Sequence, residues 1–191
     1  MVKGTVDYIG LNHYSSSYVG NNKACKPDSW WSDSCTFSTH TSIDGKLIGP
    51  QAESDWLYVY PQGIRGCLNW IDKRYNHPIV YVFENGVSVP HENELPIAQA
   101  LNDTFRIDFY KGYIQNALDA ITIDGVDLRG YFGWSFMDNF EWADGYSTRF
   151  GMTYVDYKDN QRRYVKDSLV WYSQFTRTGL FDAPIVNPDR Q

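Results

Sequence analysis

The chain has 191 residues, of which 42% are hydrophobic, 17% aromatic and 21% charged, a composition typical of a globular protein and not of a disordered chain. Its 17 Lys and Arg residues against 23 Asp and Glu residues give a net charge of −6, so we expect no nucleic-acid partner. The apolar runs are far shorter than the ~20 residues that cross a bilayer, so we expect no membrane span and no membrane partner.

The first half of the chain alternates segments typical of strands and helices. Residues 6–12 (VDYIGLN) are rich in β-branched and aromatic residues and predict a strand, which a long polar loop over about residues 15–55 follows. A helix is expected from Pro61 to Tyr75, because Pro61 suits a first helical turn and apolar residues then recur at helical spacing. Residues 79–83 (IVYVF) form a continuous apolar run, which predicts a strand covered on both faces.

The second half repeats this order. A helix is expected over about residues 103–122, with Asn102 as its N-cap, and a third strand over about residues 130–134. A hairpin near Asp159 and a last helix near residues 166–176 complete the chain. Strands that alternate with helices are typical of a parallel sheet, in which functional side chains gather at the carboxyl ends of the strands.

The cysteines and histidines are scattered without metal-ligand spacing, so we expect no metal and no cofactor. Cys25 and Cys35 lie in one polar loop, where a small disulfide is sterically reasonable, but three reduced cysteines fit the sequence as well. Cys67 falls within an apolar helical pattern and is expected to be a buried thiol.

Two segments just beyond expected strands combine acidic and aromatic residues. In FENGVSV, the Asn85-Gly86 pair alone predicts a turn with a solvated Glu84, whereas a carboxylate ending a buried strand could attack an electrophilic carbon. In WSFMDNFEW (residues 134–142), tryptophans beside acidic residues suit a sugar, which packs a C–H face on a ring while its hydroxyls bind carboxylates. A helix N-terminus with acidic residues near its dipole is the structural alternative for this second segment.

Five segments in order resemble the C-terminal part of family-1 β-glucosidases over about residues 4–178. They are VDYIGLNHYSS, WLYVYPQGIRG, PIVYVFENG, ALNDTFRIDFYKGYIQNALDAI and GYFGWSFMDNFEWADGYSTRFGMTYVDY. The resemblance implies an α/β fold, a partial TIM (β/α)8 barrel to which this chain contributes the last three βα units. It also implies that residues 1–191 form the C-terminal fragment of a single glycosidase barrel domain.

The resemblance assigns roles to individual positions. Glu84 matches the nucleophile of a retaining glycosidase, and Tyr14 matches the tyrosine that hydrogen-bonds this nucleophile. The positions that match sugar-binding residues are Asn12, Trp56, Trp134, Glu141, Trp142 and Phe150. Phe83 stands where the family usually has Thr, and His13 where it often has Tyr, but neither change removes the attacking carboxylate.

A retaining glycosidase also needs a second carboxylate, about 5–5.5 Å from the nucleophile, as acid and base. In the family this glutamate lies in an Asn-Glu-Pro motif on an earlier strand, and the chain contains no such triplet. Asn93-Glu94 is followed by Leu95 and comes after the nucleophile strand, so we expect residues 91–96 to form a solvated polar loop. Three βα units of a closed barrel would also leave two open sheet edges and an exposed apolar inner face.

Two hypotheses follow for the function. In the first, the chain carries the nucleophile and sugar-binding half of an enzyme that hydrolyses β-glycosides, and it is inactive alone because it lacks the acid/base glutamate. It would then associate with a missing N-terminal half. In the second, the chain is a non-catalytic truncated pseudoenzyme that binds glycosides or associates with full-length relatives.

Overall fold

A three-stranded parallel sheet forms the centre of the computed structural model, which describes residues 4–190. The strands are β1 (Ile9–Asn12), β4 (Val80–Asn85) and β5 (Leu128–Gly133), in the order β1–β4–β5. Both neighbouring pairs are parallel, so a crossover must return the chain to the start of each next strand. The expected first strand over residues 6–12 is shorter in the structure and begins at Ile9.

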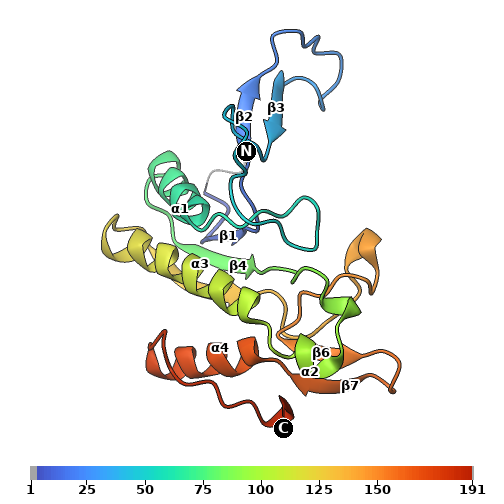
Figure 1. Cartoon of the computed structure of the whole chain (residues 1–191). Coiled ribbons are helices and arrows are strands. Elements are labelled where there is room, and N and C mark those ends of the chain that lie inside the picture. Colours follow the sequence, from blue (N-terminus) through green and yellow to red (C-terminus); the bar gives the residue numbers. More distant parts are fainter. Residues whose placement is uncertain (1–3, 191) are drawn as a thin grey trace.

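Three helices pack on this sheet, and α3 lies between α1 and α4 (Figure 1). They are α1 (Gln62–Arg74), α3 (Thr104–Thr122) and α4 (Asp167–Thr178). Pro61 caps α1 with φ −59°, and Gly179 ends α4 in the left-handed region at φ 71°, which a residue without Cβ adopts at little cost. The N-cap of α3 is Asp103, one residue after the expected Asn102.

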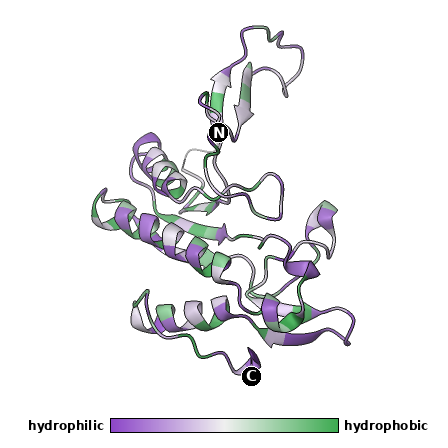
Figure 2. Cartoon of the chain, in the orientation of Figure 1, coloured by the Kyte–Doolittle hydropathy of each residue, from purple (hydrophilic) through white to green (hydrophobic). Residues whose placement is uncertain are grey.

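The two faces of the sheet have different surroundings. Val80 and Val82 of β4 are fully buried in the core beneath the helices. Hydrophobic and hydrophilic residues alternate along each of these helices (Figure 2). On the other face, Phe83 is 43% exposed and its ring lies 6.1 Å from that of Phe132 and 5.9 Å from that of Tyr8. The described part of the chain therefore has an open aromatic face, and its edge strands β1 and β5 each have one neighbour in the sheet.

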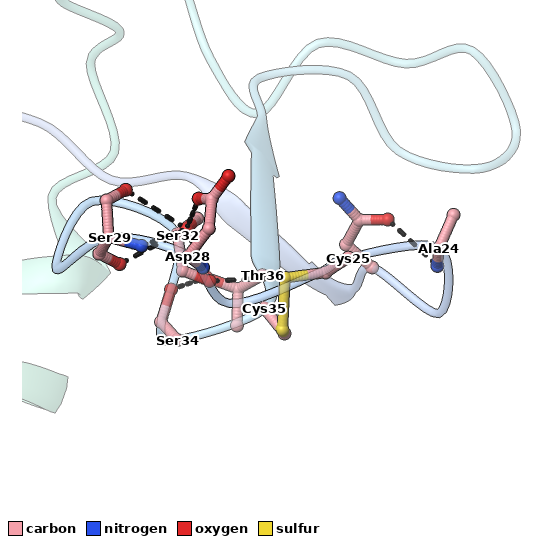
Figure 3. The surroundings of a disulfide bond; sticks show 9 residues. Ala24, Cys25, Asp28, Ser29, Ser32, Ser34, Cys35 and Thr36 are labelled. Carbon is pink, nitrogen blue, oxygen red and sulfur yellow. Dashed lines mark hydrogen bonds between the residues drawn. A yellow bond between two sulfur atoms is a disulfide. The ribbon is translucent and has the colours of Figure 1, made fainter.

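The segment expected as a polar loop contains an antiparallel hairpin, β2 (Tyr18–Asn21) and β3 (Thr36–Thr39), which projects from the sheet (Figure 1). A disulfide between Cys25 and Cys35, with Cα atoms 5.3 Å apart, closes the hairpin loop (Figure 3). The structure therefore selects the disulfide over the alternative of three reduced cysteines. Cys67 is half-buried in α1, and burial raises the pKa of its thiol.

The C-terminal third has a second hairpin, formed by β6 (Thr153–Asp156) and β7 (Arg162–Val165), where the sequence predicts one. Short helical turns complete the described chain: η1 (Glu92–Glu94), α2 (Ile97–Ala100), η2 (Trp142–Asp144) and η3 (Pro188–Arg190). Residues 134–140 form a loop, and Glu141 is the N-cap of the single turn η2, so the alternative of a helix N-terminus holds only for the end of this segment. Between residues 4 and 190, none of the helices has the length and apolarity that a bilayer crossing requires.

Candidate active site

The carboxyl ends of the three parallel strands bring three predicted site residues, Asn12, Glu84 and Trp134, to one edge of the sheet. In the register of β1 and β4, Asn12 lies opposite Glu84. Pairing continues beyond the strands, because the His13 amide donates to the Glu84 carbonyl at 2.9 Å and the Trp134 amide donates to the Asn85 carbonyl at 2.7 Å. The Asn85-Gly86 pair therefore continues from a buried strand and does not form the hairpin turn that the dipeptide alone predicts.

Gly86 permits a close approach between the end of β4 and the segment after β5. A Cβ atom at this position would lie 1.7 Å from the Trp134 carbonyl oxygen and 2.7 Å from its carbonyl carbon. These are backbone atoms, which cannot move away as the end of a flexible side chain can, so position 86 requires a residue without Cβ. The same Trp134 carbonyl accepts a hydrogen bond from the Tyr110 hydroxyl at 3.0 Å, so it is held from the helix side as well.

Tyr14 donates a hydrogen bond from its hydroxyl to Oε2 of Glu84 at 2.6 Å. Burial raises the pKa of Tyr14, and the hydrogen bond and negative charge of Glu84 raise it further. The phenol therefore stays protonated and remains a donor at ordinary pH. Its ring lies edge-on to Trp56 at 6.0 Å and to Phe150 at 6.1 Å, so two aromatic contacts orient it.

Glu141 lies close enough to Glu84 for their charges to interact. Burial raises the pKa of Glu141, a hydrogen bond from the Trp134 side chain lowers it, and the charges of Asp144 and Glu84 raise it again. The Trp134 indole thus connects the aromatic and acidic parts of the site. The Glu141 amide also donates to the Gly145 carbonyl at 2.7 Å, which fixes the backbone at this carboxylate.

The remaining predicted site residues differ in exposure. Asn12 is exposed, and Trp56 is 47% exposed. Trp142 is 85% exposed in the turn after Glu141. Within residues 4–190 its ring contacts no other aromatic ring, unlike the ring of Tyr14, which contacts Trp56 and Phe150. Phe150 is only 1% exposed and lies against Tyr14, so its place is behind the tyrosine.

The expectation of a solvated polar loop over residues 91–96 is wrong at Glu92. This side chain is 2% exposed, and its Oε2 accepts a hydrogen bond from Arg106 at 2.8 Å. Lys166 forms a second ion pair with Glu92. Both partners are distant in sequence, which is why the polar character of the segment gave no indication of burial.

His13 provides a pH-dependent contribution to stability. Burial lowers the pKa of this histidine from 6.5 to about 4. The unfolded chain therefore binds more protons than the folded chain between these values, and stability falls as the pH falls through this range. We expect the free energy of unfolding to drop by about 3 kcal/mol between about pH 7 and pH 4 from this group alone.

The His13→Phe variant should lose that part of the pH dependence, because phenylalanine does not titrate. Urea unfolding at several pH values measures it. His77→Gln, at an exposed histidine paired with Asp72, is the control. Identical pH profiles for the wild-type chain and His13→Phe would show that His13 is not the source.

The strand ends thus bring together a carboxylate that accepts a hydrogen bond from a protonated tyrosine, an indole and a second carboxylate. The profile of glycosyl hydrolase family 1 matches residues 1–180. The chain belongs to this family, and its fold is part of the TIM barrel of the family's β-glucosidases.

Similar proteins cover most of this chain. Beta-glucosidase 12 of Oryza sativa subsp. indica is 43% identical over 179 residues, which are 92% of this chain and 34% of that protein. The β-glucosidase of Trichoderma harzianum is 44% identical with a TM-score of 0.87, covering 91% of this chain and 37% of that one. The β-glucosidase of the fungus Humicola insolens, solved in complex with glucose, is 40% identical with a TM-score of 0.87, covering 93% and 37%. The chain thus spans about a third of the length of the relatives that it matches, as a C-terminal fragment.

Proposed function

We propose that the chain carries the nucleophile and the sugar-binding half of a retaining β-glucosidase site, as the last three βα units of a (β/α)8 barrel. The observation that carries this proposal is the 2.6 Å hydrogen bond from Tyr14 to Glu84 at the end of the buried strand β4. Trp134 and Glu141 beside this pair provide an aromatic face and a hydrogen-bond acceptor, which a sugar needs. The family membership and the β-glucosidase relatives support the same activity.

In the proposed reaction, Glu84 attacks the anomeric carbon of a β-glycoside. A bond forms between a carboxylate oxygen and this carbon while the bond to the leaving oxygen breaks, and water later releases the sugar. Donation from Tyr14 stabilises the ionised carboxylate. Hydrogen bonds from the sugar hydroxyls to Glu141 accelerate the reaction only as far as they strengthen in the transition state.

The acid/base glutamate must come from outside these residues. The chain has no Asn-Glu-Pro triplet, and we assign Glu141 to sugar binding. We propose that a missing N-terminal half of the barrel supplies this acid and covers the open aromatic face around Phe83. The same open face favours, as a second candidate, a non-catalytic chain that associates with full-length relatives or binds glycosides without cleaving them.

A chimaeric barrel distinguishes these functions. In it, this chain follows the N-terminal part of the Trichoderma harzianum β-glucosidase and replaces the segment that it matches. We expect the chimaera to hydrolyse a 4-nitrophenyl β-glucoside, because it combines both carboxylates. The isolated chain should be slower by about 10²–10⁴-fold or more, since it has no general acid. Equal rates for both proteins, or a folded but inactive chimaera, would contradict the proposal.

A further inference from the structure

Six charged side chains form a buried cluster behind the candidate site. Each is at most 5% exposed, and three carboxylates balance three cations. They are Glu92, Asp103, Asp138, Arg106, Arg149 and Lys166. Buried charges are costly unless they are paired and hydrogen-bonded, so a cluster of this size requires a specific arrangement of the segments that contribute to it.

Asp138 is the centre of this cluster on the side of the loop of residues 138–151, which contains Glu141. Its Oδ1 accepts from the Gly151 amide at 3.0 Å and from the Lys166 ammonium at 3.1 Å. Its Oδ2 accepts from the Val155 amide at 3.2 Å and also from Arg149. An ionised carboxylate has about four lone-pair sites, so these four donors use its full capacity.

These contacts close a loop around site residues. Asp138 and Gly151 lie on the two arms, and a Cβ at Gly151 would come within 2.1 Å of the Asp138 amide nitrogen, so the arms are in direct contact. Glu141 lies in the loop between the two arms. Trp134 lies before the loop, and its neighbour Ser135 pairs with the far arm, because the Ser135 amide donates to the Phe150 carbonyl at 3.1 Å and the Met152 amide donates to the Ser135 carbonyl at 2.9 Å. The position of the loop therefore constrains the second carboxylate directly and the indole through Ser135.

The cluster also connects this loop to the segment that follows Glu84. Lys166 pairs with both Asp138 and Glu92. Arg106 pairs with Glu92 at 2.8 Å and donates to the Val87 carbonyl at 3.2 Å, three residues after Glu84. A continuous set of ion pairs and hydrogen bonds thus joins the loop of residues 138–151 to the segment just after β4.

We propose that Asp138 is a positioning residue, which holds the loop of residues 138–151 so that Glu141 and Trp134 face Glu84. The role of the loop in sugar binding rests on the proposed function. The positioning itself is a property of the chain alone. An Asn side chain would keep one acceptor oxygen and turn an NH₂ group toward donors, so it cannot satisfy two amides and two cations.

The test uses the Asp138→Asn variant of the full 191-residue chain and two NMR measurements. The first is hydrogen exchange of the Gly151 and Val155 amides, which we expect to accelerate about tenfold or more because their acceptor is weakened. The second is the Trp134 indole N–H resonance as a function of pH, which reports the titration of the hydrogen-bonded Glu141. We expect this titration curve to shift or disappear in the variant, because the indole and carboxylate no longer hold their relative position.

Asp159→Asn, an exposed aspartate in the hairpin between β6 and β7, is the matched control and should change neither measurement. Glu141→Gln should remove the indole titration but leave the exchange of the Gly151 and Val155 amides unchanged. It therefore shows that the indole titration reports Glu141. Because neither measurement involves a sugar, failure of the proposed function would leave both results unchanged. If Asp138→Asn does not fold, Arg149→Lys is the second variant. It keeps the charge, but one ammonium cannot bind Asn93 as Nε does while it also binds Asp138 and the Val155 carbonyl as Nη1 does, so it should give the same changes.

An unchanged indole titration in folded Asp138→Asn overturns the proposal. If the amides then exchange faster, Asp138 contributes to stability alone. If they also exchange at the wild-type rate, the carboxylate has no role in holding the loop.

Discussion

The Glu84→Gln substitution, in the chimaeric barrel that combines this chain with the N-terminal part of a β-glucosidase, should lower hydrolysis of an aryl β-glucoside on the order of 10⁴-fold or more. An amide retains the size of the side chain and a hydrogen-bond acceptor for Tyr14, which donates to Oε2 at 2.6 Å. It does not provide a carboxylate to form the glycosyl-enzyme. Steady-state rates with a 4-nitrophenyl β-glucoside measure the loss.

Two matched substitutions separate this effect from general damage. Glu94→Gln changes a glutamate whose side chain is 76% exposed, and it should leave the rate unchanged. Glu141→Gln should weaken the reaction but still permit a covalent intermediate, because it leaves the attacking group in place. A covalent sugar trapped on the Glu84→Gln variant by a slow fluorinated substrate would count against the assignment of the nucleophile.

The second large effect concerns Gly86. We expect Gly86→Ala to lower the free energy of unfolding by about 3 kcal/mol, as in severe overpacking of a closely packed position. The added methyl group would lie 1.7 Å from the Trp134 carbonyl oxygen, so the end of β4 and the segment after β5 must separate. Urea unfolding of the chain measures the stability, and the chimaera should lose activity because Trp134 moves away from Glu84.

Gly66→Ala is the control for this substitution. Gly66 lies inside α1, and a Cβ there would have no atom within 4 Å. Alanine in an open helical position should stabilise the chain by about 0.5–1 kcal/mol. Equal effects of the two substitutions would show that the close contact at Gly86 does not constrain the fold.

The helices were the most predictable part of the fold, because their signals are local. Pro61 and Gly179 lie at a helix start and a helix end, as their backbone preferences indicate. The hairpin of β2 and β3 escaped prediction because its strands are short and largely exposed on both faces, so they show no apolar alternation. The disulfide between Cys25 and Cys35 fixes the loop of this hairpin, but the sequence alone did not decide between that disulfide and three reduced cysteines.

In the candidate site too, the sequence indicates some residues, while the contacts between them become visible only in the fold. The resemblance to the family assigns Glu84 and Tyr14, but their hydrogen bond joins residues 70 positions apart and becomes visible only in the fold. The burial of Glu92 depends on Arg106 and on Lys166, which no local pattern connects to it. Sequence patterns therefore locate residues that a strand end or a known motif marks, and they miss residues whose role depends on pairing across the fold.

Covalent labelling of the chimaera tests the central assignment most directly. A 2-fluoro glucoside with a dinitrophenolate leaving group needs no acid for the first step, so labelling depends on the nucleophile alone. Mass spectrometry of the digested protein should find one fluorinated sugar, attached to Glu84. A label on Glu141 or on any other carboxylate of an active chimaera would contradict the account.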